Sequence, residues 1–159
     1  MAFDPTQFWG TDYYKNPPLT DSMVAEAEKR LGVILPVEFI ALLRSQNGGY
    51  TKGFGYPMTQ RTSWADNHVP LDELNGIGSP ETPLSGHNIF GRDYFAEEWG
   101  LPPNQVLLAG DGHWWLTLDY RKSPSPSVSW LDTEVGEDVP VARSFAAFLE
   151  RLRSSAEFD

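Results

Sequence analysis

Two stretches near the start of the chain place apolar residues at helical spacing. The first follows Thr20 and Asp21, either of which can cap a helix, and it ends at Gly32, which tolerates the left-handed backbone of a helix C-terminus. The second starts at Pro36, which suits a first helical turn, and stops at Asn47. The short link between them predicts a helical hairpin. The inward-facing positions are Met23, Val24, Ala27 and Leu31, then Phe39, Ile40, Leu42 and Leu43.

Beyond this hairpin the pattern changes to short apolar runs separated by turn residues. Ser144 then caps a last amphipathic helix with a stripe that includes Phe145 and Phe148. This order of elements predicts an α+β fold, a single domain with one central, mainly antiparallel sheet, an N-terminal helical hairpin and a C-terminal helix. We expect strands over 53–59, 69–71, 106–109, 114–120, 128–132 and 139–141, a loop over 76–91 and a helix over 92–99.

The length of 159 residues suits one hydrophobic core, so we expect one domain over 1–159. Within it, residues 1–19 form an aromatic N-terminal arm. Exposing all these rings would leave a large apolar patch, so the arm should pack on the core. Its rings are Phe3, Phe8, Trp9, Tyr13 and Tyr14.

Composition narrows the chemistry further. The chain has no cysteine, which excludes disulfides, thiol catalysis and cysteine-based metal sites, and suits a reducing cytoplasm. Neither a signal peptide nor an apolar run of bilayer length stands out, so we expect a cytoplasmic protein that does not enter a membrane. The net charge is -10, and residues 93–138 carry nine acidic and two basic residues. Such a surface disfavours direct binding of nucleic acid and would attract a basic partner, although the excess acid could also serve only solubility.

Several motifs together resemble the SUKH superfamily, in its branch named after the fungal Smi/Knr cell-wall regulator. The strongest is a helix ending in Gly, then Leu-Pro, a second helix and Asn-Gly-Gly, followed by NGIG, EEWG, GDGHWWLTLDYR and a final Ser-Phe helix. The resemblance extends over about residues 19–152. The residues that carry it most directly, to which we assign structural roles, are Leu35, Pro36, Asn47, Gly48, Gly49, Gly76, Gly78, Asp111, Gly112 and Asp119.

This resemblance implies a binding module. Bacterial members resemble immunity proteins, which bind and neutralise toxins, often nucleases, whereas fungal members regulate cell-wall synthesis and carry long disordered extensions. The present sequence shows no such extensions, so immunity is the expected role and a cell-envelope adaptor the alternative. The segment 123–127, with two prolines, replaces a glycine-containing link often found between the family's strands.

Catalysis has weaker support in the sequence. Ser85, His87 and Asp93 supply the residue types of a hydrolase, but Ser85 lacks a Gly-x-Ser-x-Gly setting. Asp111 and His113 could face one metal ion, but two ligands do not make a site and the histidines lack metal-ligand spacing. We therefore expect neither an enzyme nor a metal or cofactor.

Aromatic and charged residues in the loops and turns are the better functional candidates. Binding hot spots favour Trp, Tyr and Arg, and surrounding charge steers a partner. Adjacent strand residues face opposite sides, however, so one of Trp114 and Trp115 should be core, and core or solubility roles remain open for the others. The predicted partner-binding residues are Trp64, Asp66, His68, Glu97, Glu98, Trp99, His113, Trp114, Tyr120 and Arg121.

Overall fold

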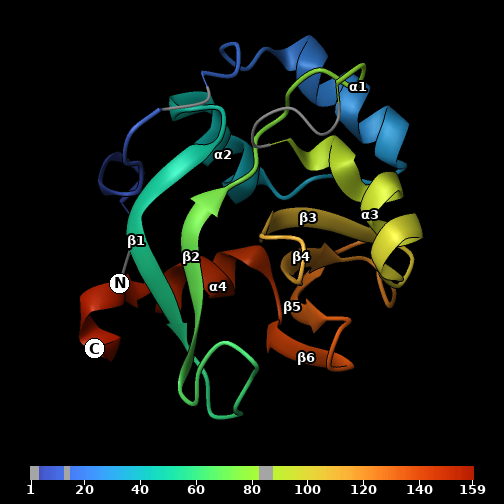
Figure 1. Ribbon diagram of the computed structural model, residues 1–159. Helices are drawn as coiled ribbons and strands as arrows, with labels where there is room; N and C mark the ends of the chain where they lie inside the picture. Colours follow the sequence, from blue (N-terminus) through green and yellow to red (C-terminus); the bar gives the residue numbers. More distant parts are fainter. Residues whose placement is uncertain (1–3, 13–14, 83–87) are drawn as a thin grey trace.

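The computed structural model in Figure 1 describes residues 4–12, 15–82 and 88–159. Within these ranges the helices are α1 (Asp21–Leu31), α2 (Val37–Ser45), α3 (Arg92–Trp99) and α4 (Phe145–Arg151), with 3₁₀ turns η1 (Pro5–Gln7), η2 (Ile89–Gly91) and η3 (Ser155–Phe158). The strands are β1 (Gly49–Pro57), β2 (His68–Leu74), β3 (Gln105–Gly110), β4 (Trp114–Asp119), β5 (Ser127–Asp132), β6 (Glu137–Ala142) and β7 (Arg153–Ser154).

Local caps set the helix ends. The side chains of Thr20 and Ser144 each accept a hydrogen bond from the backbone N–H three residues later, at the starts of α1 and α4. Gly32 ends α1 in the left-handed conformation, with φ of 69°. These predicted boundaries are confirmed. Pro36 was predicted in the first turn of the second helix, but it is the N-cap residue, one position before α2 begins at Val37. Its ring cannot accept a capping hydrogen bond.

The strands pair antiparallel in two sheets. One has the order β2-β1-β7 and the other the order β3-β4-β5-β6. The predicted α+β class, with helices at both ends and antiparallel pairing, is confirmed, but the single sheet of the prediction is divided into two. Asn75, directly after β2, links the two sheets. Its backbone N–H donates to Leu108 O in β3 at 2.7 Å, and its side chain donates to Leu107 O at 2.9 Å. The division arises because the chain leaves β2, runs past α3 and starts a separate four-strand meander.

The main core lies between the two sheets, where α4 contacts α2, β1, β5 and β6. Phe148 of α4 stacks on Tyr56 of β1 at 5.1 Å, and Phe145 meets Phe39 of α2 edge-on at 5.6 Å. The opposite face of the four-stranded sheet is covered by α3, which lies beside β3 in Figure 1. There a second apolar cluster forms from Leu101, Leu107, Trp115 and Leu131.

Two motifs of the resemblance meet in space. The Asn47 side chain accepts from the Ile77 N–H at 2.8 Å and donates to Ile77 O at 2.9 Å. A Cβ atom on Gly76 would lie 2.2 Å from Asn47 O, and one on Gly48 would lie 2.6 Å from Gly76 N. Glycine is therefore required at both positions, because the two backbone segments touch. We call this contact between residues 47–49 and 76–78 the glycine junction.

The N-terminal segment contacts the helical hairpin and β1. Phe8 is fully buried and stacks on Phe54 at 5.4 Å, and the Trp9 indole donates to Leu42 O at 2.9 Å. An isolated bridge pairs Trp9 with Thr51. Phe3, Tyr13 and Tyr14, which we also assigned to the arm, lie outside the described residues.

Candidate protein-binding surface

The loop 58–67, which joins β1 to β2, lies against the end of the four-stranded sheet that carries the β3–β4 and β5–β6 turns. The Ser63 N–H donates to Glu137 Oε1 at 2.8 Å, and its hydroxyl donates to Asp132 Oδ2. Asp132 is nearly buried at the end of β5, and its other oxygen accepts from the Glu134 N–H at 3.1 Å. One carboxylate thus ties the loop of the three-stranded sheet to the β5–β6 turn of the four-stranded sheet.

Three tryptophans form a column from the core to the surface next to this loop. Trp130 is fully buried, and its indole donates to Glu137 Oε1 at 3.0 Å. Trp114 stacks on it with ring centroids 5.0 Å apart, and Trp64 meets Trp114 edge-on at 5.7 Å. Trp64 is 45% exposed, so the column ends in an indole ring that is fixed on one side and open to solvent on the other.

Trp114 also carries an unpaired polar group. Its indole N–H is buried, and no residue in the described part of the chain accepts a hydrogen bond from it. Leaving such a donor unpaired costs about 1–3 kcal/mol. The partial burial of the ring and its stacking on Trp130 offset this cost. The neighbouring Trp115 points to the opposite face of the sheet, into the cluster under α3, as strand alternation predicts.

The β3–β4 turn adds a histidine held among carboxylates. His113 Nδ1 lies 2.8 Å from Glu134 Oε1, and the Asp111 side chain accepts from the backbone N–H groups of His113 and Trp114. The hydrogen bond to Glu134, and then the charges of Glu134, Asp111 and Asp132, raise the pKa of His113 above its ordinary value. Trp99, at the end of α3, meets the His113 ring edge-on at 5.9 Å.

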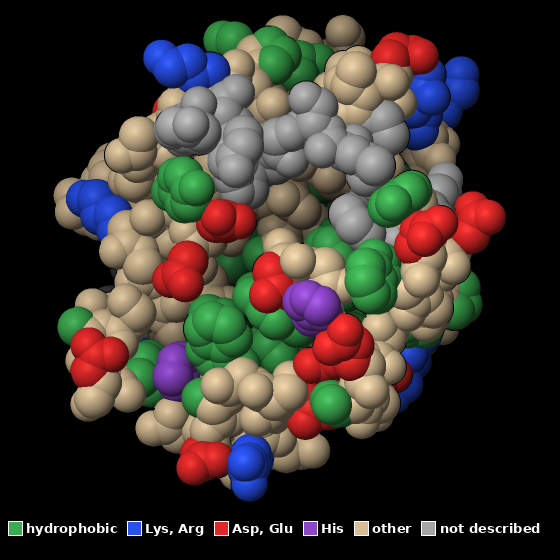
Figure 2. Space-filling model, viewed as in Figure 1, with side chains coloured by type: hydrophobic (Ala, Val, Ile, Leu, Met, Phe, Trp, Pro, Cys, Tyr) green, Lys and Arg blue, Asp and Glu red, His purple; other side chains and the backbone are tan. Residues whose placement is uncertain are grey.

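These contacts gather residues from four elements on one face. In Figure 2 hydrophobic side chains and a histidine occupy the centre of this face, acidic side chains surround them, and Lys and Arg side chains lie towards its periphery. Glu97 and Glu98 are exposed in the last turn of α3, which also carries Trp99. We call this region the acidic aromatic surface and define it as Trp64, Trp99, Asp111, His113, Trp114 and Glu134.

Two of the predicted partner-binding residues lie at the other end of β4. The Tyr120 hydroxyl donates to Ile34 O at 2.7 Å, and burial, followed by the charge of Glu28, raises the pKa of Tyr120. Arg121 forms ion pairs with Asp119 and Asp138, each at 2.7 Å. A six-residue strand separates these residues from His113, about 20 Å at 3.3 Å per residue. Tyr120 and Arg121 therefore do not join the acidic aromatic surface.

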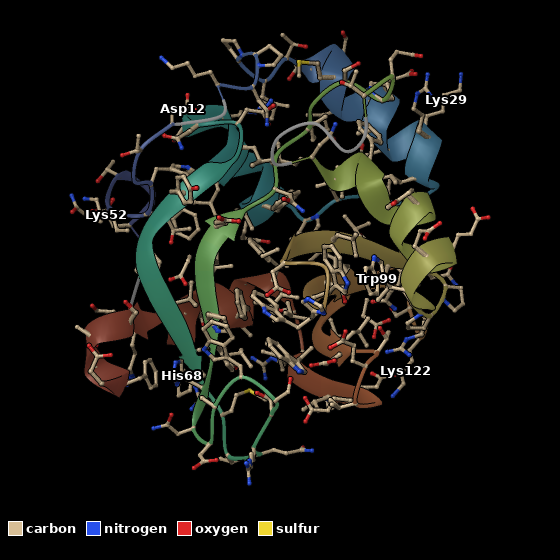
Figure 3. All side chains as sticks on the ribbon, viewed as in Figure 1. Asp12, Lys29, Lys52, His68, Trp99 and Lys122 are labelled. Carbon is tan, nitrogen blue, oxygen red and sulfur yellow. The ribbon has the colours of Figure 1, made fainter. Side chains whose placement is uncertain are left out.

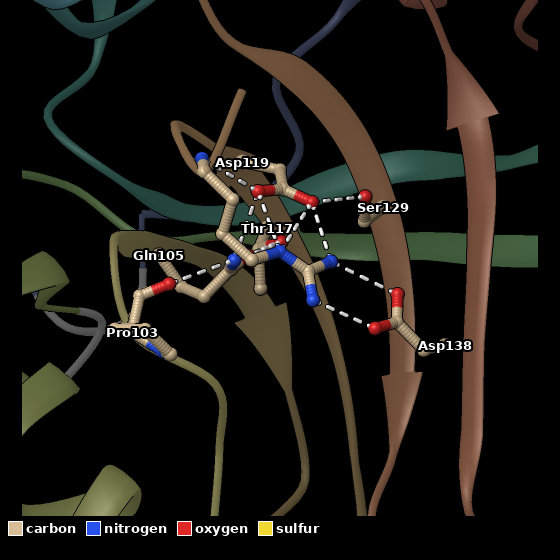
Figure 4. A network of polar contacts seen from close by, with 7 residues as sticks. Pro103, Gln105, Thr117, Asp119, Ser129 and Asp138 are labelled. Atoms are coloured by element: carbon tan, nitrogen blue, oxygen red, sulfur yellow. Dashed lines mark hydrogen bonds and ion pairs between the residues drawn. The ribbon is translucent and has the colours of Figure 1, made fainter. Parts of the chain in front are cut away.

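Asp119 is the centre of the polar network drawn in Figure 4. Its carboxylate accepts hydrogen bonds from Gln105 at 2.9 Å and Ser129 at 2.8 Å as well as from Arg121. Burial alone would raise the pKa of Asp119, but the hydrogen bonds from Arg121, Ser129 and Gln105 outweigh it and hold the pKa below its ordinary value. The network fastens β3, β4, β5 and, through Asp138, β6 to one another.

Asp66 and His68 are placed differently again. Asp66 forms an exposed ion pair with Arg61 at 3.2 Å within the loop 58–67. His68 stacks on Phe158 near the C-terminus at 4.3 Å. Figure 3 labels His68 at the end of β1 and β2, away from Trp99. Of the ten predicted partner-binding residues, the contacts join Trp64, Trp99, His113 and Trp114.

The sequence did not reveal the acids that organise this surface. Asp132, Glu134 and Glu137 are ordinary turn and strand residues in the sequence, and Ser63 is 69 positions from its partner Asp132. The only local signal is the acidic content of 93–138, which does not say which carboxylates will meet. Their contacts depend on how the loop of one sheet docks on the other.

The residues considered for catalysis do not form a described site. Ser85 and His87 lie outside the described residues, as does the side chain of Asp93. Among the residues the structure does describe, no three His, Asp or Glu side chains are grouped so as to hold a metal ion. None of the described helices has the length and apolar character needed to cross a membrane.

Comparison with known families agrees with the motifs. The sequence model of the SMI1 / KNR4 family (SUKH-1) matches residues 18–151. The chain belongs to the SMI1 / KNR4 family. The matched region runs from just before α1 to the end of α4, so it includes the four-stranded sheet, strands β1 and β2 of the other sheet and the glycine junction, whereas β7 lies beyond it. No curated protein matches the chain at a significant level.

Proposed function

We propose that this member of the SMI1 / KNR4 family acts in the cytoplasm as an immunity protein, which neutralises a basic toxin by stoichiometric binding rather than by catalysis. The observation that supports this most is the acidic aromatic surface. Its tryptophans are of the residue type that dominates binding hot spots, and its acids match a cationic partner. A nuclease is the expected toxin, because a protein surface that binds nucleic acid is basic.

The exposed apolar residues agree with this proposal. Large apolar side chains exposed together mark interaction sites more often than single ones do. Three such side chains among the described residues lie at the end of the four-stranded sheet that carries the β3–β4 and β5–β6 turns. They are Trp64, Trp99 and Val135. The surrounding carboxylates would speed the encounter with a positively charged partner.

The test is a titration of the activity of a cognate toxin, which is to be sought first among the products of the neighbouring genes. Inhibition should saturate at one molecule of immunity protein per toxin, and the toxin should be recovered chemically unchanged. The association rate should fall as salt rises from 0.1 M to 1 M, because the Debye length drops from about 10 Å to about 3 Å. Replacing Glu97 and Glu98 by Gln should also lower that rate, while Glu150→Gln on α4 should not. Inhibition at far less than one equivalent, with modification of the toxin, would refute the proposal.

A second exposed apolar area favours the alternative of a cell-envelope adaptor that binds several partners. Ile34 and Val37, on either side of the Leu35-Pro36 pair, are largely exposed, and a groove of about 720 Å³ runs from Ile34 past Tyr120 to Pro124. Deletion of the gene separates the two roles. Loss of an immunity protein is harmful only when toxin is present, whereas loss of an adaptor changes growth or wall integrity without toxin.

A further inference from the structure

We propose that the outer face of Trp64 binds the guanidinium group of an arginine side chain of the partner. The inference rests on the proposed function in taking the partner to be a basic protein, and it adds the side chain that is recognised and the place where it binds. Three features of the structure support it: the fixed position of the ring, the charge around it and the absence of a cation of this chain upon it.

The ring of Trp64 is held in place before any partner arrives. Trp114 supports it from inside at 5.7 Å, and the adjacent Ser63 is bonded through its backbone to Glu137 and through its hydroxyl to Asp132. A flexible loop would have to be ordered on binding, at a cost in affinity. Here the loop is already docked, so a ligand meets a preformed aromatic face.

Carboxylates contact the residue next to Trp64, since Glu137 and Asp132 both accept hydrogen bonds from Ser63. The Asp132 carboxylate links Ser63, next to Trp64, to the backbone of Glu134, so the Glu134 side chain belongs to the same local structure. Glu134 itself is about half exposed and contacts His113. A cation over the ring would therefore lie in a negative field. The Glu134 carboxylate contacts His113 through Oε1, and a carboxylate can accept more than one hydrogen bond, so it can also accept from the N–H groups of a ligand.

No cation of the described chain occupies the ring. Arg61 is in the same loop, but its guanidinium pairs with Asp66 at 3.2 Å. Among the described residues the cation–π contact is that of Arg151 over Tyr56, on another part of the molecule. The Trp64 face is thus open to a cation supplied by another protein.

Arginine fits this arrangement better than lysine does. Its guanidinium is planar, weakly hydrated and able to stack on an indole while its edge donates to a carboxylate. An ammonium group is compact and strongly hydrated, and it gives up more hydration when it lies against a ring.

The test uses a tetra-arginine peptide with blocked ends, at 0.15 M salt, and follows the indole N–H signals by NMR. The signal of Trp64, assigned by its loss in Trp64→Leu, should shift on titration. Tetra-citrulline, which has the same shape without the charge, should leave the signal in place. Trp64→Leu should weaken peptide binding about fivefold, the range expected of a cation–π contact. The control is Tyr94→Leu, because Tyr94 is 46% exposed and Trp64 is 45% exposed, and it should bind as the unaltered protein does.

A second pair of variants tests the surroundings. Glu134→Gln should weaken the peptide severalfold and Glu150→Gln should not, although each removes one exposed acid. Ser63→Ala keeps the ring but removes a loop hydrogen bond, so it should also weaken binding, which provides a second test of the site if Trp64→Leu does not fold. Equal binding of tetra-citrulline, or equal affinity of the Trp64 and Tyr94 variants, would overturn the inference.

The outcome can be separated from that of the proposed function. Neutralisation of the toxin by a protein that does not bind tetra-arginine at Trp64 would refute this inference and leave immunity standing. Binding of tetra-arginine at Trp64 without any effect on the toxin would support the arginine site and refute the immunity role.

Discussion

Replacing Asp119 by asparagine should lower the free energy of unfolding far more than replacing the exposed Asp138 in the same network would. The Asp119 side chain is 10% exposed, and its two oxygens accept from Gln105, Ser129 and both the backbone and the guanidinium of Arg121. In the Asp119→Asn variant one oxygen becomes an amide N–H₂, which would face the donors of Ser129 and Arg121. Two charge-assisted hydrogen bonds are lost, each contributing about 1.5–3 kcal/mol. Allowing for relaxation of the surroundings, we expect a loss of about 3 kcal/mol.

The control is Asp138→Asn. Asp138 is 50% exposed and bonds only the outer side of Arg121, which would keep its pairing with Asp119. Exposed ion pairs contribute at most about 1 kcal/mol, so this variant should lose no more than that. Urea unfolding followed by tryptophan fluorescence measures both variants. The argument fails if Asp119→Asn loses less than about 0.5 kcal/mol, or no more than Asp138→Asn.

The stability that the unaltered protein has over Asp119→Asn should decrease as the pH is lowered into the acidic range. Because the pKa of Asp119 is lower in the folded than in the unfolded chain, its contribution is fully present above the unfolded value of 3.8. It is lost as the pH falls through the folded pKa. The difference in unfolding free energy between the unaltered protein and Asp119→Asn should therefore be constant near neutral pH and shrink below about pH 4. A difference that grew on acidification would contradict the assignment.

Two other outcomes are expected. Gly76→Ala should lower the free energy of unfolding by about 2–3 kcal/mol or more, measured by calorimetry, because its Cβ would lie 2.2 Å from Asn47 O. The control Gly32→Ala has no atom within 4 Å of the new Cβ and should lose only about 1 kcal/mol, because of its positive φ. Equal losses would contradict the glycine junction. The imidazole of His113 should titrate above its ordinary value of 6.5 by NMR, and in Glu134→Gln its pKa should fall towards that value; an unchanged pKa would mean that the two side chains are not paired in solution.

Local signals in the sequence predicted the parts of the fold that depend on local interactions. A helix cap is decided within four residues, so Ser144 and Gly32 were identified correctly, and Thr20 is the cap of the two candidates, Thr20 and Asp21. Period-two alternation likewise separated Trp114 from Trp115, since it follows from the backbone of a single strand. The division into two sheets was missed, because alternation tells which face a residue occupies and does not tell which strand is its neighbour. Strand β7, only two residues long, has no pattern to detect.

The candidate site followed the same rule. Aromatic type and acidic content grouped ten residues as partner-binding without indicating which of them come into contact. Within the described part of the chain, the contacts join only four of the ten, namely Trp64, Trp99, His113 and Trp114. The carboxylates that position the group were missed, since Ser63 and Asp132 meet only through the docking of one sheet's loop on the other sheet. Tyr120 and His113 were predicted to share one surface, but they lie at opposite ends of β4, which extends by about 3.3 Å for every residue.

The glycine junction has a consequence for how this domain can change over generations. Its backbone segments touch at Gly48 and Gly76, where any side chain would meet backbone atoms of the other segment. The acidic aromatic surface is instead built on a loop, two hairpin turns, one helix end and the first residue of β4. If this surface binds a partner as proposed, substitutions of its exposed residues would change recognition without touching the glycine junction. Under the proposed function, the partner of this domain could therefore change by successive substitutions at that surface, because the glycine junction that holds the fold together lies elsewhere in the chain.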